Sequence, residues 1–155
     1  MIGLIDIVKY LVENGVGVNA KDELGRSALQ LAAKKGHVDI VKYLVKNGAD
    51  INAKDKWSTS TLQLAAMIRL IGFVKYLVEN SVEVNAKDKW STSALELAAR
   101  IGLIDIVKYL VENSVGVNAK DKLGRSALQL AAKKGDVDIV KYLVKNGADI
   151  NAKDK

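Results

Sequence analysis

Few side chains in this sequence could carry catalysis or hold a metal ion. There is one histidine, His37, and no cysteine, so a thiolate nucleophile, a disulfide frame and a thiolate metal site are excluded. Asp50–Asp55 has spaced oxygen donors like a calcium loop, but Lys54 occupies a ligand position, and the turn glycine and final glutamate are missing. No nucleophile motif or phosphate-cradling glycine loop occurs. We therefore expect no catalytic residue, no metal site and no cofactor, and not an enzyme.

The side chains best suited to recognition are the two tryptophans, Trp57 and Trp90. Aromatic side chains often dominate the affinity of protein interfaces. The two lie 33 positions apart, each inside the sequence Asp-Lys-Trp-Ser-Thr. The elements that position them are therefore expected to repeat with the same spacing.

The 33-residue spacing runs along the whole chain. It separates Asp22, Asp55, Asp88 and Asp121, and also Tyr10, Tyr43, Tyr76, Tyr109 and Tyr142. A constant period of this length indicates stacked units, none of which can bury its apolar face alone. The pattern predicts a single domain with a partial unit at residues 1–20, full units at 21–53, 54–86, 87–119 and 120–152, and a stub at 153–155.

Each full unit carries the signals of two short helices. A serine followed three residues later by glutamine or glutamate forms a capping box at the start of the first helix. These pairs are Ser27 and Gln30, Ser60 and Gln63, Ser93 and Glu96, and Ser126 and Gln129. A second helix is expected to begin near Val38 and to stop at Asn47-Gly48, with the glycine left-handed. Ser81 and Ser114 replace this glycine, at an expected cost on the order of 1 kcal/mol each.

The segments Asp22–His37 and Asn47–Ala53 resemble the ankyrin repeat, and the resemblance covers essentially the whole chain. It implies an all-α solenoid of stacked helix–turn–helix units with β-hairpin-like loops. The family's usual Thr-Pro-Leu-His start reads Ser-Ala-Leu-Gln or Ser-Thr-Leu-Gln here, and there is no proline, but the capping box supplies another helix start. Residues 1–55 nearly duplicate residues 100–154, which indicates a recent tandem duplication or an engineered array.

Positions that vary between units are the candidates for partner contact, because framework positions should stay constant. One variable cluster is the loop before the first helix, and the other is the stretch between the two helices. By resemblance to ankyrin proteins, both lie on the concave surface that usually binds partners. The predicted protein-binding residues are Trp57, Thr59, Met67, Ile68, Arg69, Leu70, Trp90, Thr92, Arg100, Ile101 and Leu103.

A packing role is the alternative for part of this set. The aliphatic residues Ile68, Leu70, Ile101 and Leu103 could pack between adjacent helices, and the tryptophans could cover the loops below them. The repeated tyrosines differ, because each lies in an invariant Val-Lys-Tyr-Leu-Val segment. This constancy favours framework packing of the second helices over a ligand site.

The net charge of +6 and the pI of about 9.4 raise nucleic acid as a partner. The lysines, however, recur at equivalent positions along the chain, for example Lys9, Lys42 and Lys75. Such dispersed repetition is typical of a solvated face. Nucleic acid binding is therefore the less favoured alternative.

The sequence favours a non-enzymatic scaffold that binds another protein through the concave face of the central units. The alternative is self-association, through the same apolar surface or through the ends of the array, where helices lack a neighbouring unit. No apolar run is long enough to span a membrane, and the N-terminus lacks the basic region and cleavage site of a signal peptide. We expect a cytoplasmic location, or a recombinant protein without a native one.

Overall fold

The computed structural model describes residues 3–153 and contains, within that range, nine helices and no sheet. The helices are α1 (Leu4–Glu13), α2 (Ala28–Lys35), α3 (Val38–Lys46), α4 (Thr61–Met67), α5 (Ile71–Glu79), α6 (Ala94–Ile101), α7 (Ile104–Glu112), α8 (Ala127–Lys134) and α9 (Val137–Lys145). The predicted all-α fold class is confirmed. The beginning of the partial unit at residues 1–20 and most of the stub at 153–155 fall outside the described residues.

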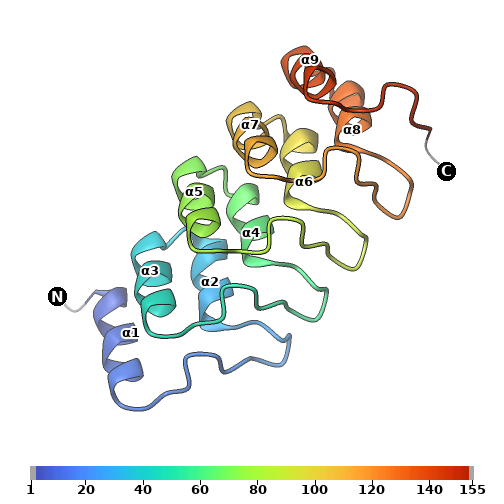
Figure 1. Cartoon of the computed structure of the whole chain (residues 1–155). Coiled ribbons are helices and arrows are strands. Elements are labelled where there is room, and N and C mark those ends of the chain that lie inside the picture. The colour runs from blue at the N-terminus through green and yellow to red at the C-terminus, as the bar shows by residue number, and fades with distance from the viewer. Residues whose placement is uncertain (1–2, 154–155) are drawn as a thin grey trace.

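Helix pairs stack along one direction into an elongated array, with the two chain ends at opposite extremes (Figure 1). The first helices form one row, in which α2 contacts α4, α4 contacts α6 and α6 contacts α8. The second helices form the other row, in which α1 contacts α3, and α7 contacts both α5 and α9. The loops all project to the same side, beside the first helices (Figure 1). Side chains on those loops and helices can therefore share one surface.

The four predicted capping boxes are all present. The Ser27 hydroxyl accepts a hydrogen bond from the Gln30 amide at 3.3 Å, and the Gln30 side chain accepts one from the Ser27 amide at 3.2 Å. The same exchange begins α4, α6 and α8. α3 runs from Val38 to Lys46 and is capped by Asn47, which is followed by left-handed Gly48, as the sequence predicts. Local capping therefore sets these helix boundaries.

Hydrogen bonds between successive loops fix the register of the array. The Gln30 side-chain amide donates to the Thr59 carbonyl at 3.0 Å, so a capping residue also holds the loop of the next unit. The Lys56 amide donates to the Leu24 carbonyl at 3.0 Å, and the Lys89 amide donates to the Trp57 carbonyl at 2.9 Å. These bonds place equivalent loop residues side by side along the array.

The core is a continuous row of buried side chains, mainly leucine and alanine in the first helices and leucine, isoleucine and valine in the second. Outside it, the second helices form a ladder in which a lysine ammonium lies over the tyrosine ring of the following unit. The pairs are Lys9 and Tyr43, Lys42 and Tyr76, Lys75 and Tyr109, and Lys108 and Tyr142, at 5.4 to 5.9 Å from the ring centroid. These contacts agree with a framework role for the tyrosines.

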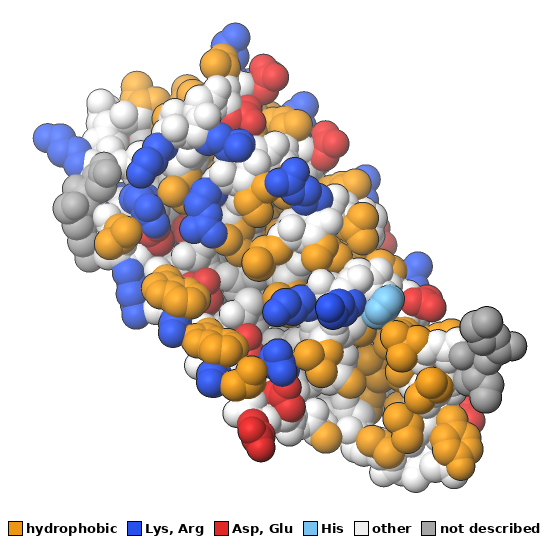
Figure 2. All heavy atoms as spheres, turned by 180° about the vertical axis from the view of Figure 1, so that it is seen from behind, with side chains coloured by type: hydrophobic (Ala, Val, Ile, Leu, Met, Phe, Trp, Pro, Cys, Tyr) orange, Lys and Arg blue, Asp and Glu red, His pale blue; other side chains and the backbone are white. Residues whose placement is uncertain are grey.

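The first helix of the array has an open apolar face. No described residue of α1 is buried, and Leu4, Ile7, Tyr10 and Leu11 are exposed. Hydrophobic side chains gather at this end of the molecule in Figure 2. Self-association through the ends of the array stays a prediction.

Candidate functional site

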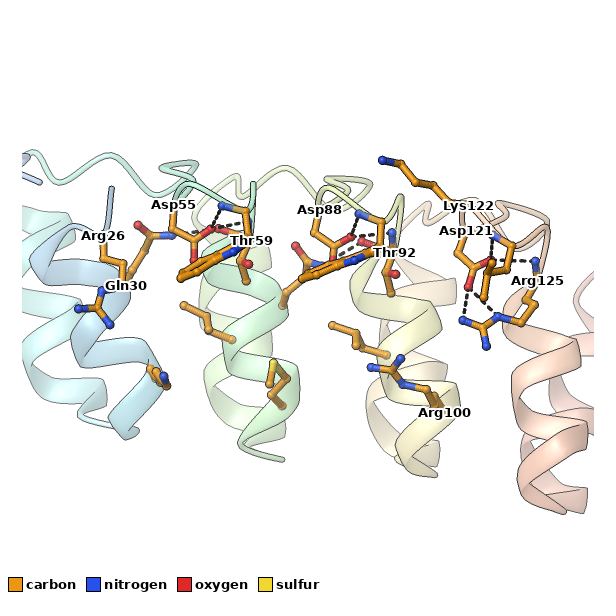
Figure 3. Close-up of a pocket in the computed structure, with 18 of the residues that line it drawn as sticks. Arg26, Gln30, Asp55, Thr59, Asp88, Thr92, Arg100, Asp121, Lys122 and Arg125 are labelled. Atoms are coloured by element: carbon orange, nitrogen blue, oxygen red, sulfur yellow. Dashed lines mark hydrogen bonds and ion pairs between the residues drawn. The ribbon is translucent and has the colours of Figure 1, made fainter. Parts of the chain in front are cut away.

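A groove of about 840 Å³ lies between the loops and the first helices (Figure 3). Leucine and methionine side chains from α2, α4 and α6 form its apolar part, and the loops contribute tryptophan, aspartate and arginine. The lining residues are Arg26, Gln30, Leu31, Lys34, Asp55, Trp57, Thr59, Gln63, Leu64, Met67, Asp88, Trp90, Thr92, Leu97, Arg100, Asp121, Lys122, Leu123 and Arg125. The groove therefore extends over four successive loops and combines apolar surface with both signs of charge.

Each tryptophan is held by a tight turn around an aspartate. In the loop of unit 54–86, Oδ1 of Asp55 accepts hydrogen bonds from the Trp57 and Thr59 amides, both at 2.9 Å. Ser58, between them, has a positive φ of 60° that closes the turn. The next unit repeats this arrangement around Asp88 and Trp90. The tryptophan backbones are thus fixed at a constant spacing along the groove.

Lysine ammonium groups lie against the indole rings. Lys56 Nζ lies 4.6 Å from the centroid of the Trp57 ring, and Lys89 Nζ lies 4.5 Å from that of Trp90 and 6.0 Å from that of Trp57. Trp57 is half-buried, whereas 53% of the Trp90 surface is exposed. The cation–π contacts orient the rings, and a large part of the Trp90 surface still faces solvent.

The loops that flank the two tryptophan loops use an arginine in place of the threonine. Arg125 donates from Nε to Asp121 Oδ2 at 2.8 Å, and its terminal nitrogen lies 2.7 Å from the same oxygen. Burial acts to raise the pKa of Asp121, but the hydrogen bonds from the Arg125 side chain and backbone outweigh it and hold the pKa below its usual value. Arg26 makes the same contacts with Asp22, and its hydrogen bonds lower the pKa of that carboxyl.

One buried carboxyl, that of Glu96, lies in the first turn of α6. Oε2 of Glu96 accepts a hydrogen bond from the Ser93 amide at 3.0 Å, whereas Oε1 is buried without a hydrogen-bond partner among the described residues. Burial raises the pKa of Glu96 to about 7, against the smaller opposing effects of the Ser93 hydrogen bond and the Lys87 charge. The equivalent residue in the preceding unit, Gln63, donates from its amide to the Thr92 carbonyl at 2.9 Å.

Six of the predicted binding residues line the groove, and five do not. The groove brings together Trp57, Thr59, Met67, Trp90, Thr92 and Arg100. Thr92 is buried and contributes little surface, whereas Met67 is 53% exposed and Arg100 is exposed. The residues outside the groove lining are Ile68, Arg69, Leu70, Ile101 and Leu103.

The residues outside the groove lie at the turns between the paired helices. Ile68 and Leu103 are half-buried and pack against the core, as the packing alternative predicts. A Cβ atom placed on Gly36 would lie 3.6 Å from Ile68 Cδ1 and 3.7 Å from Leu70 Cδ1, so both side chains face the preceding unit. Arg69 is exposed and Ile101 is half-buried. Contact of these five residues with a partner stays a prediction.

Sequence reasoning missed the constant residues of the groove. Leu31, Leu64 and Leu97 occupy equivalent positions in three first helices, so a search for variable positions passes over them. Asp55 and Asp88 were missed for the same reason. A usable signal was present nevertheless, because arginine changes to threonine four residues after a constant aspartate.

Other kinds of site find no support in the described part of the chain. Among residues 3–153, no group of three or more histidine, cysteine, aspartate or glutamate side chains could hold a metal ion. Within the same range, no helix has the length and apolar character needed to cross a membrane.

The sequence model of the family described as ankyrin repeats (3 copies) matches residues 1–55 and 62–154. The chain belongs to the ankyrin repeat family. This confirms the resemblance and the repeat solenoid that it implies. No curated protein matches the chain. Ankyrin repeats are generally protein-interaction modules, typically without enzymatic activity, so the groove of this ankyrin array is considered below as a protein-binding surface.

Proposed function

We propose that this ankyrin array is a non-enzymatic scaffold that binds another protein in the groove over its central units. The observation that carries the proposal is the exposed Trp90, beside Trp57 and Met67, in a groove whose rim carries charged side chains. An exposed apolar patch with a polar rim is the usual composition of a protein interface. Aromatic side chains in such a patch act as anchors.

The distribution of charge on the surface supports a protein partner over nucleic acid. On the face seen in Figure 2, lysine and arginine side chains are interspersed with hydrophobic and acidic ones. The groove lining itself includes the carboxylates Asp55, Asp88 and Asp121. A phosphate backbone would meet repulsion at Asp55 and Asp88, which form no ion pair within the described residues, whereas a polypeptide can place opposite charges beside both signs.

The flanking units supply a conservative test. Leu24 and Leu123 occupy the positions equivalent to the two tryptophans, so Trp57→Leu and Trp90→Leu introduce a side chain that these loops already accommodate. Peptides selected from a random displayed library against the wild type should lose at least about tenfold in affinity for the double variant. The helical circular dichroism signal should stay unchanged.

Two results would count against the proposal. If the selected peptides bound both proteins equally, contact would lie elsewhere on the array. If the double variant lost its cooperative unfolding transition, the tryptophans would serve packing instead. Molar mass measured over a range of protein concentrations separates groove binding from self-association.

A further inference from the structure

In the two flanking loops, the aspartate of the turn binds an arginine side chain of the same loop. In both loops the aspartate Oδ1 accepts hydrogen bonds from two backbone amides, and Oδ2 receives a guanidinium. For Arg26 and Asp22 these side-chain distances are 2.8 and 2.7 Å, and Arg125 and Asp121 repeat them. In both flanking loops, therefore, the same turn directs the Oδ2 oxygen of its aspartate toward an arginine.

The central loops keep the turn but lack the arginine. Thr59 and Thr92 stand in its place, and no cation forms an ion pair with Asp55 or Asp88 within residues 3–153. Asp55 Oδ2 accepts no hydrogen bond from the described residues. Asp88 Oδ2 accepts only the Gln63 amide, at 3.3 Å. In Figure 3, Asp121 is joined to the Arg125 side chain, whereas Asp55 and Asp88 are joined to loop amides.

The same two loops also place an indole ring in the groove that these carboxylates line. Trp57 follows Asp55 by two residues and Trp90 follows Asp88 by two, and all four side chains line the groove. A guanidinium is planar, can bring two nitrogens to one carboxylate oxygen, as Arg26 and Arg125 do, and stacks on aromatic faces. A carboxylate beside an indole therefore fits a guanidinium on both counts.

We infer that the central loops bind arginine side chains of the partner, one at Asp55 and Trp57 and the other at Asp88 and Trp90. This inference rests on the proposed function and names the chemistry of the partner: a polypeptide segment with exposed arginine. The partner's guanidinium takes the position that Arg26 and Arg125 fill in the flanking units. Loss of the internal arginine thus converts a structural ion pair into a recognition site.

The charged residues around these two loops restrict which residues can flank the arginine in the partner polypeptide. Lys34, Arg100 and Lys122 also line the groove, and none of them forms an ion pair within the described residues. A uniformly basic segment would be repelled by them, so acidic residues are expected on either side of the arginine. Lys56 and Lys89 lie on the indole rings but are exposed, and their ammonium groups can turn into solvent when a guanidinium enters.

The experiment restores the missing arginines. A displayed library of random twelve-residue peptides is selected against the wild-type protein, and the enriched peptides are synthesised and titrated by isothermal calorimetry, which needs no tryptophan and therefore serves every variant. The same peptides are then titrated against the Thr59→Arg, Thr92→Arg double variant. This variant carries the residue that both flanking loops have at that position, and it keeps both tryptophans.

Arginine should be enriched in the selected peptides, and their affinity should fall at least tenfold in the double variant. Replacing the peptide arginine by citrulline, which is neutral but similar in shape, should cause a comparable loss. A Glu13→Gln, Glu79→Gln control raises the net charge by the same amount at exposed residues outside the groove lining, and it should bind within about twofold of the wild type.

Two outcomes separate this inference from the proposed function. If the selected peptides lack arginine, or bind the arginine variant as well as the wild type, the inference fails. The groove proposal stands in that case, provided that the Trp57→Leu, Trp90→Leu double variant still binds at least about tenfold more weakly than the wild type. If no selected peptide is sensitive to the tryptophan substitutions, both fail together.

Discussion

The central units, 54–86 and 87–119, carry backbone strain that the flanking units avoid. Five non-glycine residues in the described part of the chain have positive φ, between 60° and 68°, and all lie in the central units: Ser58, Arg69, Ser81, Ser91 and Ser114. The units 21–53 and 120–152 have glycine at each equivalent position, for example Gly25 and Gly48. The left-handed conformation therefore occurs in the central and the flanking units alike, but only the flanking units have glycine, which adopts it without strain, at these positions.

The strained units are also the ones that carry the groove tryptophans. Ser58 lies directly between Trp57 and Thr59, at the turn that positions both. Strained backbone gathers at functional sites when the surrounding structure holds it in place. The comparison therefore indicates that the central units are locally less stable around the groove than the flanking units.

The largest expected effect comes from removing the strain in all five positions together. Replacing Ser58, Arg69, Ser81, Ser91 and Ser114 by glycine should stabilise the protein by about 3 to 5 kcal/mol. Each left-handed non-glycine residue costs about 1–2 kcal/mol, and the entropy of glycine in the unfolded chain offsets part of the gain. Urea unfolding followed by circular dichroism measures the difference.

The reverse substitution in a flanking unit is the matched control. A Cβ atom on Gly48 would meet no atom within 4 Å, so Gly48→Ser isolates the backbone cost from any steric clash. It should destabilise the protein by about 1 kcal/mol. If neither set of variants changed the unfolding midpoint, the difference between the units would not be energetic.

The next largest effect is expected at Glu96, where one central unit departs from the glutamine of every other capping box. Glu96→Gln should stabilise the protein by about 3 kcal/mol above pH 7, because the pKa is raised from 4.5 to about 7 and each unit is worth about 1.4 kcal/mol. The introduced amide can also donate a hydrogen bond, as Gln63 does to Thr92.

The effect of Glu96 on stability should depend on pH in a defined direction. Between about pH 4.5 and 7 the native state binds more protons at Glu96 than the unfolded state, so its contribution to stability falls as the pH rises. The difference between wild type and Glu96→Gln should therefore grow across this window and become constant above it. Unfolding free energies at several pH values test this, and a difference independent of pH would contradict the burial argument.

The smallest effect on stability is expected when the arginine of a flanking loop is replaced by the threonine of the central loops. Arg125→Thr removes the ion pair with Asp121 and should cost about 2 kcal/mol at neutral pH, because the Asp121 side chain is only 4% exposed and loses its charge partner, although it keeps two hydrogen bonds from loop amides. The lowered pKa of Asp121 means that this contribution is present above pH 3.8 and is lost as the pH falls. The wild type and the variant should therefore converge in stability in acid; a constant difference would point to lost packing of the arginine stem.

The sequence by itself determined the features that depend on near neighbours in the chain. The helix starts follow from a serine and a glutamine or glutamate three residues apart, and the left-handed conformation of Ser81 and Ser114 follows from their alignment with Gly48. The constant period indicated stacking, since a single unit cannot bury its apolar face. These conclusions need only local hydrogen bonding and the repeat length.

Only the tertiary structure decided which side chains share the groove. Met67 and Ile68 are adjacent in sequence and both vary between units, yet Met67 lines the groove and Ile68 packs against the core. Their directions depend on how α4 ends and on the packing of α2 and α6 on either side of it. The burial of Glu96 and the unpaired carboxylates of Asp55 and Asp88 likewise arise from contacts between units, because solvent exposure and ion pairing are set by neighbours in space, which the repeat pattern alone does not place.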